Sequence, residues 1–220
     1  MIEVNNIEVY GWEAAIRGMR NPMNSWAKSD SDYIKDDGFF AFKIGDNDLD
    51  LMRRLYKAGP EHRKYLRMIH VTTDVNAPLY WWKEFDTYKI ATVSNSCSTM
   101  HKIAAKEFTE NDFSHDHLDS EGLFALHMVI NALNTNRELH LNAKVNGKKD
   151  LAKHYWWNMI QLLPSSYNQR RTVDRNYETV INMIGQRSGH KLDEWRTLVE
   201  QFKQLPYIAE ITGEEDKTNE

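Results

Sequence analysis

The segment from Val75 to His101 constrains this chain most, because it joins an aromatic helical pattern directly to a run of polar residues. The Ala77-Pro78 pair opens it, and proline is favoured in the first helical turn, where its missing N–H would have no partner. Four aromatic residues mixed with charged ones then predict a helix. The polar run from Thr92 to Thr99 is either a surface that binds a polar ligand or a solvated loop.

The length and composition indicate one globular domain. The 220 residues contain no linker-like stretch, and 41% of them are hydrophobic, which is enough for a sizeable core. No apolar run approaches the roughly 18 residues of a membrane span, and the N-terminus lacks an export signal. Cys97 is the single cysteine, which excludes an intramolecular disulfide and a multi-cysteine metal site. These features predict a cytoplasmic protein.

The charge balance limits the possible partners. The net charge is −4, with 28 basic and 32 acidic residues spread along the sequence. A protein that coats a nucleic acid needs a large basic surface, so a nucleic-acid polymer is not an expected partner. A local basic pocket for an anion the size of a nucleotide remains compatible with this composition.

The periodicity of apolar residues predicts a single helix-rich α+β domain with a mixed sheet. In the helix over 46–58, Asp48 is expected as the cap and Gly59 as the stop. Residues 1–205 are expected to form the domain, and residues 206–220 a charged, flexible tail. The predicted strands are 2–10, 38–44 and 65–75, the predicted loop is 30–37, and the other predicted helices are 12–19, one starting near Pro78, 123–133, 149–163, 172–187 and 192–205.

Arginines and asparagines gather in the C-terminal third of the sequence. Arginine suits bidentate contacts with a phosphate or with the carbonyl edge of a pyrimidine. On a helix starting near Thr172, positions 175, 179, 182 and 186 share one face, with Asn176, Met183 and Arg187 as near neighbours. The alternative is an ordinary solvated helix face.

Three further patterns have a functional and a structural interpretation. His115-Asp116-His117, with Asp119 and Glu121, has metal-ligand residue types, but no second element completes a site, so a polar loop rich in capping residues is favoured. Cys97 is either a nucleophile or a structural thiol, and no neighbouring base motif supports the first. The pairs Trp81-Trp82 and Trp156-Trp157 are more typical of core or interface residues than of a flavin-stacking site.

With these residues the chain resembles the flavin-dependent thymidylate synthases over about residues 1 to 205. That family has Ala-Pro, then Gln-x-x-Arg-His-Arg, then Ser-x-Asn-Glu-x-Ser-x-Arg. When the family motifs are aligned without a gap from Ala77-Pro78, Glu84 falls on the Gln of the first motif. Thr87-Tyr88-Lys89 then falls on its Arg-His-Arg. The second motif places Ser94, Asn95, Cys97 and Thr99 at the family's Asn, Glu, second Ser and last Arg. A shift of one residue instead places Asn95 on the Asn and Ser98 on the Ser, and both registers stay open.

The C-terminal part of the resemblance is closer. The family has an arginine 23 residues after a Leu-Pro, and Arg187 stands at that spacing from Leu163-Pro164. Asn176 and Asn182 fall on asparagines that the family uses at the flavin. Upstream, His62 and Lys64 correspond to the family's His-x-Thr-Pro flavin loop, and Arg17 and Arg20 to its N-terminal arginines.

The sequence departs from the family at charged positions. Thr87-Tyr88-Lys89 replaces Arg-His-Arg, so two positive charges are missing and Lys89 lacks the guanidinium fork. Ile160 and Glu178 stand where the family has arginines. The side chains that could restore positive charge from other positions are Lys83, Lys102, Arg170, Arg171 and Arg175.

The resemblance implies a homotetrameric flavoenzyme that converts dUMP to dTMP. Methylene-tetrahydrofolate would donate the carbon, FAD would act as reductant and NADPH would recharge it. Arg187 is expected to polarise the pyrimidine. His62, Lys64, Lys89, Asn176 and Asn182 are expected at the flavin, and the expected nucleotide ligands are Glu84, Ser94, Asn95, Cys97, Ser98 and Thr99. The alternatives are a homologue that binds flavin or another nucleotide without this reaction, and a non-catalytic interaction protein.

Overall fold

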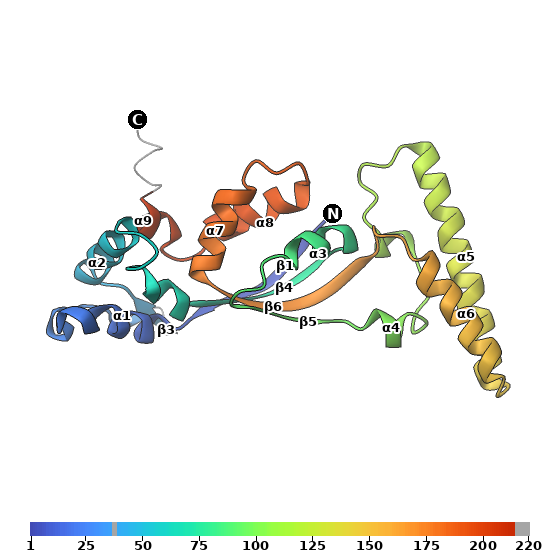
Figure 1. Ribbon diagram of the computed structural model, residues 1–220, viewed down its shortest axis with the longest axis horizontal. Coiled ribbons are helices and arrows are strands. Elements are labelled where there is room, and N and C mark those ends of the chain that lie inside the picture. The colour runs from blue at the N-terminus through green and yellow to red at the C-terminus, as the bar shows by residue number, and fades with distance from the viewer. Residues whose placement is uncertain (37–38, 214–220) are drawn as a thin grey trace. The chain divides into compact units, whose positions relative to one another are not determined.

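A computed structural model describes residues 1–36 and 39–213, and it confirms an α+β fold (Figure 1). The chain forms two compact units. The first unit contains Met1–Asn5, Asp74–Tyr88 and Ser94–Thr172, and the second contains Asn6–Thr73, Lys89–Val93 and the chain from Val173 onward. The start of the predicted strand at Gly38 and the end of the predicted tail lie outside the described residues.

Four strands make up the main sheet, in the order β1-β4-β6-β5. They are β1 (Glu3–Tyr10), β4 (His70–Pro78), β6 (Asn168–Asn176) and β5 (Thr92–Ser96), and each contributes residues to both units. Along β4, half-buried and buried residues alternate, because successive side chains of a strand point to opposite faces. One face of β4 therefore supplies core residues, and the other carries polar side chains.

The first unit contains α3 (Leu79–Phe85), α4 (Thr99–Lys102), η4 (Glu110–Asp112), α5 (Ser120–Val145) and α6 (Lys149–Leu162). Helices α5 and α6 lie side by side as a hairpin (Figure 1). The Asp119 carboxylate caps α5 by accepting from the Gly122 N–H at 2.8 Å. Trp81 and Trp82 are buried, as expected of core residues, whereas Trp157 is 44% exposed. The hairpin core consists of Ile103, Phe108, Phe113, Leu126, Ile130, Leu133 and Met159.

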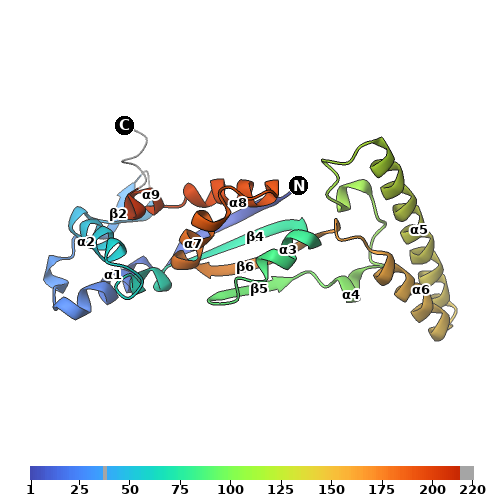
Figure 2. The same cartoon turned by 45° about the horizontal axis from the view of Figure 1, so that its top comes forward.

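The second unit contains α1 (Trp12–Arg20), α2 (Asp46–Lys57), α7 (Tyr177–Arg187), α8 (Asp193–Lys203) and α9 (Ile208–Thr212). The short helices η1 (Asn21–Met23), η2 (Trp26–Lys28) and η3 (Lys64–Met68) connect them, and β2 (Asp32–Asp36) pairs antiparallel with β3 (Phe39–Lys43). Helix α2 contacts α9, and α7 contacts α8 (Figure 2). The core includes Trp12, Met52, Leu66, Tyr177, Trp195 and Phe202.

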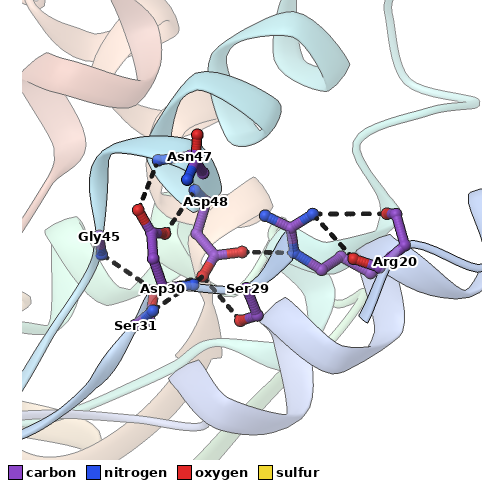
Figure 3. Close-up of polar contacts among 8 residues, drawn as sticks. Arg20, Ser29, Asp30, Ser31, Gly45, Asn47 and Asp48 are labelled. Carbon is purple, nitrogen blue, oxygen red and sulfur yellow. Dashed lines mark hydrogen bonds and ion pairs between the residues drawn. The ribbon is translucent and has the colours of Figure 1, made fainter. Parts of the chain in front are cut away.

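A buried ion pair joins α1 to α2 (Figure 3). Arg20 Nε donates to Asp48 Oδ1 at 2.6 Å, and Asp48 is fully buried. The other oxygen of Asp48 accepts from the Ser29 hydroxyl, the Asp30 and Ser31 N–H groups and the Ser31 hydroxyl. The predicted capping role of Asp48 is therefore wrong.

Asp30 supplies the cap of α2 instead. Its carboxylate accepts from the N–H groups of Asn47, at 2.9 Å, and Asp48, at 3.1 Å. A Cβ on Gly45 would lie 2.2 Å from the Asp30 carboxyl carbon, so this approach requires glycine. The sequence did not reveal this cap, because Asp30 precedes the helix by 16 residues and reaches it only through the fold.

Several predicted boundaries differ from the structure, and four of the differences change the type of element. Residues 32–36 form β2 rather than a loop, and residues 65–68 form part of η3 rather than a strand. Residues 172–176 belong to β6, so α7 begins only at Tyr177, and position 175 does not share a helix face with 179. Residues 208–212 form α9, with Ile208 and Ile211 buried, although the flexible tail was expected from residue 206. Strand pairing and burial between distant segments override the local pattern in each case.

Candidate functional site

The first unit contains a cavity of about 320 Å³ beside the segment that follows β5. Its volume lies within the range of about 300–1,000 Å³ that is usual for small-molecule sites. Ile103, Phe108 and Tyr167 give it an apolar wall, and burial raises the pKa of the Tyr167 phenol. The polar lining comes from Asn76, Cys97, Ser98, Thr99, Asn111, Asn168 and Gln169.

Hydrogen bonds to β6 hold the segment after β5 in place. The Cys97 N–H donates to the Arg170 carbonyl at 2.9 Å. The Gln169 amide donates to the Cys97 carbonyl at 3.0 Å and to the Thr99 hydroxyl at 3.2 Å. The Ser98 hydroxyl accepts from the His101 N–H, which caps α4. The segment is therefore anchored to β6 at Cys97 and Thr99, on one side of the cavity.

The charged lining of this cavity is predominantly positive. Lys102, Lys106 and Arg170 line it together with one carboxylate, Asp112. Lys106 pairs with Asp112, and Arg170 pairs with Asp74 at 2.7 Å. Lys102 is exposed and forms no ion pair within the part of the chain that the structure describes. The cavity thus offers a cationic edge, a polar floor and an apolar wall, which suits an anionic ligand with a ring.

The structure separates the predicted nucleotide ligands into two groups. Cys97, Ser98 and Thr99 line the cavity, with Ser98 and Thr99 half-buried. Ser94 and Asn95 are exposed on β5, and neither they nor the α3 residue Glu84 are among the lining residues.

Sequence reasoning did not find Asn76, Lys106, Asn111 or Gln169 as lining residues. Gln169 stands beside the two arginines that were identified, at 170 and 171, but an isolated glutamine carries no sequence signal of its own. Asn76 on β4 and Gln169 on β6 come near Cys97 only through the sheet, in which β6 lies between β4 and β5.

All five predicted flavin residues belong to the second unit. His62, Lys64 and Lys89 are exposed, and Asn182 is exposed on α7. Asn176 is buried, and its side-chain oxygen accepts from the Thr179 N–H and hydroxyl, both at 3.0 Å, as the cap of α7. Asn176 therefore has a structural role that the resemblance did not indicate.

Two arginines that are close in sequence to His62 and Lys64 surround the Glu178 carboxylate and leave a net positive charge there. Arg63 Nε lies 3.3 Å from Glu178, and Arg67 pairs with the same carboxylate. Burial alone raises the pKa of Glu178, but the bonds from Arg67 and Arg63 outweigh it and lower the pKa. Two guanidinium groups around one ionised carboxylate leave one positive charge, which is the charge of the arginine that the family has at position 178.

The remaining arginines have defined environments. Arg187 is half-buried at the end of α7, with its guanidinium 4.7 Å above the Trp195 ring. Arg171 pairs with Asp86 and lies over Trp82 at 4.2 Å. Arg175 is fully buried and donates to Thr73 Oγ1 at 2.6 Å, and burial lowers its pKa to about 9. Arg175 therefore has no exposed face for a ligand, contrary to one of the roles considered for it.

Residues of the His-Asp-His motif form short polar contacts with a carboxylate and with the N-terminal amine. His115 Nε2 and His127 Nε2 lie 3.1 and 2.7 Å from the two Glu110 oxygens. Asp116 pairs with the N-terminal amine at 2.9 Å. Among the residues that the structure describes, no group of three His, Cys, Asp or Glu side chains is arranged to hold a metal ion. No helix formed by residues 1–36 and 39–213 has the length and apolar character of a membrane-spanning segment.

Comparisons with known proteins support the fold. No family model and no curated protein matches the sequence. The structure is similar to that of flavin-dependent thymidylate synthase ThyX from Helicobacter pylori, complexed with FAD and dUMP, with a TM-score of 0.62 and 20% identity over 96% of this chain and 97% of that chain. A second ThyX structure from that organism, with the same ligands, gives a TM-score of 0.63 at the same identity and coverage.

A methylase structure is also similar. The UMP/dUMP methylase PolB from Streptomyces cacaoi, bound with 5-Br UMP, has a TM-score of 0.56 and 12% identity over 97% of this chain and 92% of that chain. These similarities confirm the expected fold class: the chain has the fold of the flavin-dependent thymidylate synthases. At these identities, function has to be argued from the residues.

Proposed function

We propose that this protein is a flavin-dependent methyltransferase that converts dUMP to dTMP, with methylene-tetrahydrofolate as carbon donor and NADPH as the source of reducing equivalents. One observation carries the proposal. Cys97, Ser98 and Thr99, at the positions of the family's nucleotide motif, line a cavity that three cationic side chains also line. The family motif ends in an arginine at the position of Thr99, and Lys102 stands one helical turn after that position.

The second unit provides donors that fit an anionic flavin dinucleotide. His62, Lys64 and Lys89 are exposed and can donate to phosphate oxygens, and the cluster of Arg63, Arg67 and Glu178 adds one net positive charge. Bound FAD would supply the reducing equivalents for forming the methyl group. The chain's own part is to position the nucleotide and to stabilise charge on the pyrimidine, the role proposed for Arg187.

The experiment that tests this function is a titration of the purified protein with FAD and then with dUMP. We expect a yellow protein with a flavin absorption band that dUMP perturbs. A colourless protein that takes up no added FAD would contradict the proposal. A flavin band that dUMP leaves unchanged would exclude dUMP as the substrate.

Replacing Lys102 by alanine is expected to weaken dUMP binding about ten-fold, because one charge-assisted contact with the phosphate is lost. The same flavin perturbation, or calorimetry, measures the dissociation constant. Lys153→Ala, which removes an exposed lysine of α6, is the matched control and should leave the affinity unchanged. Equal affinities for all three proteins would remove Lys102 from the nucleotide site.

A second substrate is favoured by a specific observation. The chain is similar to a methylase whose described substrates include UMP as well as dUMP, and Thr87-Tyr88-Lys89 departs from the family motif. The same titration should therefore be repeated with UMP, and the affinities for UMP and dUMP compared. Tighter binding of UMP than of dUMP would identify UMP as the preferred nucleotide.

We also propose that the protein is a homotetramer, as in the family it resembles. Supporting this, the α5–α6 hairpin exposes large apolar side chains, with Phe124 68%, Met128 56% and Val145 88% exposed. Phe124 and Met128 are four residues apart and share one helix face. Light scattering coupled to size-exclusion chromatography should give about four times the 25.9 kDa chain mass, and the mass of a single chain would contradict it.

A further inference from the structure

The second unit contains a cavity of about 330 Å³ whose residues are not among those proposed for the nucleotide or the flavin. Helix α1, η2 and the segment leading into β2 supply most of its wall. Two arginines, two aromatic residues and two serines characterise its lining: Arg17, Arg20, Trp26, Phe42, Ser29 and Ser31.

Arg20 is a buried cation with one donor group left over. Its side chain is 4% exposed; Nε donates to Asp48, and Nη1 donates to the Ser25 carbonyl at 3.2 Å. Nη1 also lies 3.4 Å from the Ser25 hydroxyl. Its other terminal nitrogen, Nη2, forms no hydrogen bond with any described residue (Figure 3). A guanidinium fixed at two of its nitrogens is a pre-organised donor for an anion.

Arg17 adds a second positive charge on the same face of α1, three residues before Arg20. Its side chain is exposed and forms no ion pair within residues 1–36 and 39–213. Asp48 already balances the charge of Arg20, whose Nη2 remains a donor. The unpaired charge of Arg17 beside that donor favours an occupant with a negatively charged acceptor group.

Trp26 provides a fixed aromatic surface at this cavity. Its ring is 51% exposed, yet its Nε1 donates to Asn21 Oδ1 at 2.8 Å, which holds the indole in place. Phe42 lines the same cavity and packs edge-on against Tyr33, with ring centroids 5.2 Å apart. An immobilised, half-exposed indole suits stacking with a flat ring.

The acidic side chains at this cavity limit the charge of the occupant. Glu13 and Asp32 also line it, and both accept from Tyr33, Glu13 from the hydroxyl at 3.4 Å and Asp32 from the N–H at 2.7 Å. Because Asp48 balances Arg20, Glu13 and Asp32 outnumber the remaining cation, Arg17, and a ligand with at most one negative charge is favoured over a phosphate dianion. We propose that this cavity binds an aromatic carboxylate, with its ring against Trp26 and its carboxylate on Arg17 and Arg20 Nη2.

The test uses benzoate as the probe and the full chain without added flavin or nucleotide, so its outcome does not depend on the proposed enzyme activity. Ligand-observed saturation-transfer NMR should show saturable binding in the millimolar range or tighter, as expected for a ligand of this size. Benzamide, which lacks the charge, and cyclohexanecarboxylate, which lacks the aromatic ring, should each bind at least about ten-fold more weakly.

Substitutions at two exposed side chains test whether benzoate binds in this cavity. Arg17→Ala and Trp26→Ala should each weaken benzoate binding about ten-fold. Arg54→Ala, at an exposed arginine of α2, and Trp157→Ala, at an exposed tryptophan of α6, are the matched controls and should bind like the unmodified protein. Absence of benzoate binding, or equal binding by Arg17→Ala, Trp26→Ala and the two controls, would overturn the proposal.

Discussion

Replacing Asp48 by alanine is expected to lower the free energy of unfolding by about 3–5 kcal/mol, because it leaves the Arg20 charge buried without its partner. Arg20 is 3% and Asp48 0% exposed, so water cannot replace the lost contact. Donors from Ser29, Asp30 and Ser31 lose their acceptor at the same time. Urea denaturation followed by circular dichroism measures the loss, which is a large part of a typical domain stability of about 5–15 kcal/mol.

A matched control separates burial from charge. Asp50→Ala removes a carboxylate from the same helix, where it pairs with Arg54 at 64% exposure, and it should cost about 0.5 kcal/mol or less. If Asp48→Ala and Asp50→Ala prove equally mild, the Arg20–Asp48 pair does not stabilise the fold.

The pH dependence of stability gives a second readout of the same pair. Burial raises the pKa of Asp48, but hydrogen bonds from Ser31, Ser29, Arg20 and Asp30 outweigh it and hold the pKa below its ordinary value of 3.8. A lowered folded pKa means that the contribution is present above about pH 4 and is lost as the pH falls through the folded value. The stability difference between the unmodified protein and Asp48→Asn should therefore shrink below about pH 4.

Replacing Arg187 by alanine is expected to abolish methylation, with a fall of at least about 100-fold in kcat, while FAD and dUMP still bind. The physical reason is the loss of the cation proposed to stabilise charge on the pyrimidine; removal of one such donor typically costs 10²–10³ in rate. The Trp195 ring, 4.7 Å from the guanidinium, restricts where that charge can lie. Turnover assays with either nucleotide, together with flavin absorbance, measure both effects.

Two variants sharpen this test. Arg187→Lys keeps the charge but not the planar fork, so it should recover only part of the rate. Arg54→Ala, an exposed arginine paired with Asp50, should keep full activity. If Arg187→Ala retains activity, the arginine has no catalytic role; if the unmodified protein turns over neither nucleotide, the proposed reaction itself is wrong.

The local sequence pattern was sufficient for most elements. The predicted helix over 12–19 and the structure's α1 agree to one residue, and the predicted helix over 46–58 corresponds to α2 at Asp46–Lys57. Apolar spacing determines these helices because each buries one face. The helix predicted for residues 172–176 was wrong because pairing with a distant strand overrides the local pattern. These residues belong to β6, which pairs with β4, and the helix starts only after the Asn176 cap.

By itself, the sequence determined the α+β class, the order of most helices and the segment around Cys97 that lines a cavity. Only the tertiary structure decided which cations and amides join that segment, since Asn76 and Gln169 reach it through strand pairing. It also decided that Asp48 is the partner of Arg20 rather than a helix cap, and that Glu178 is held between two arginines. Helix and strand patterns follow from neighbours along the chain, whereas the charge and shape of a site depend on residues far apart in sequence, whose proximity is set by packing.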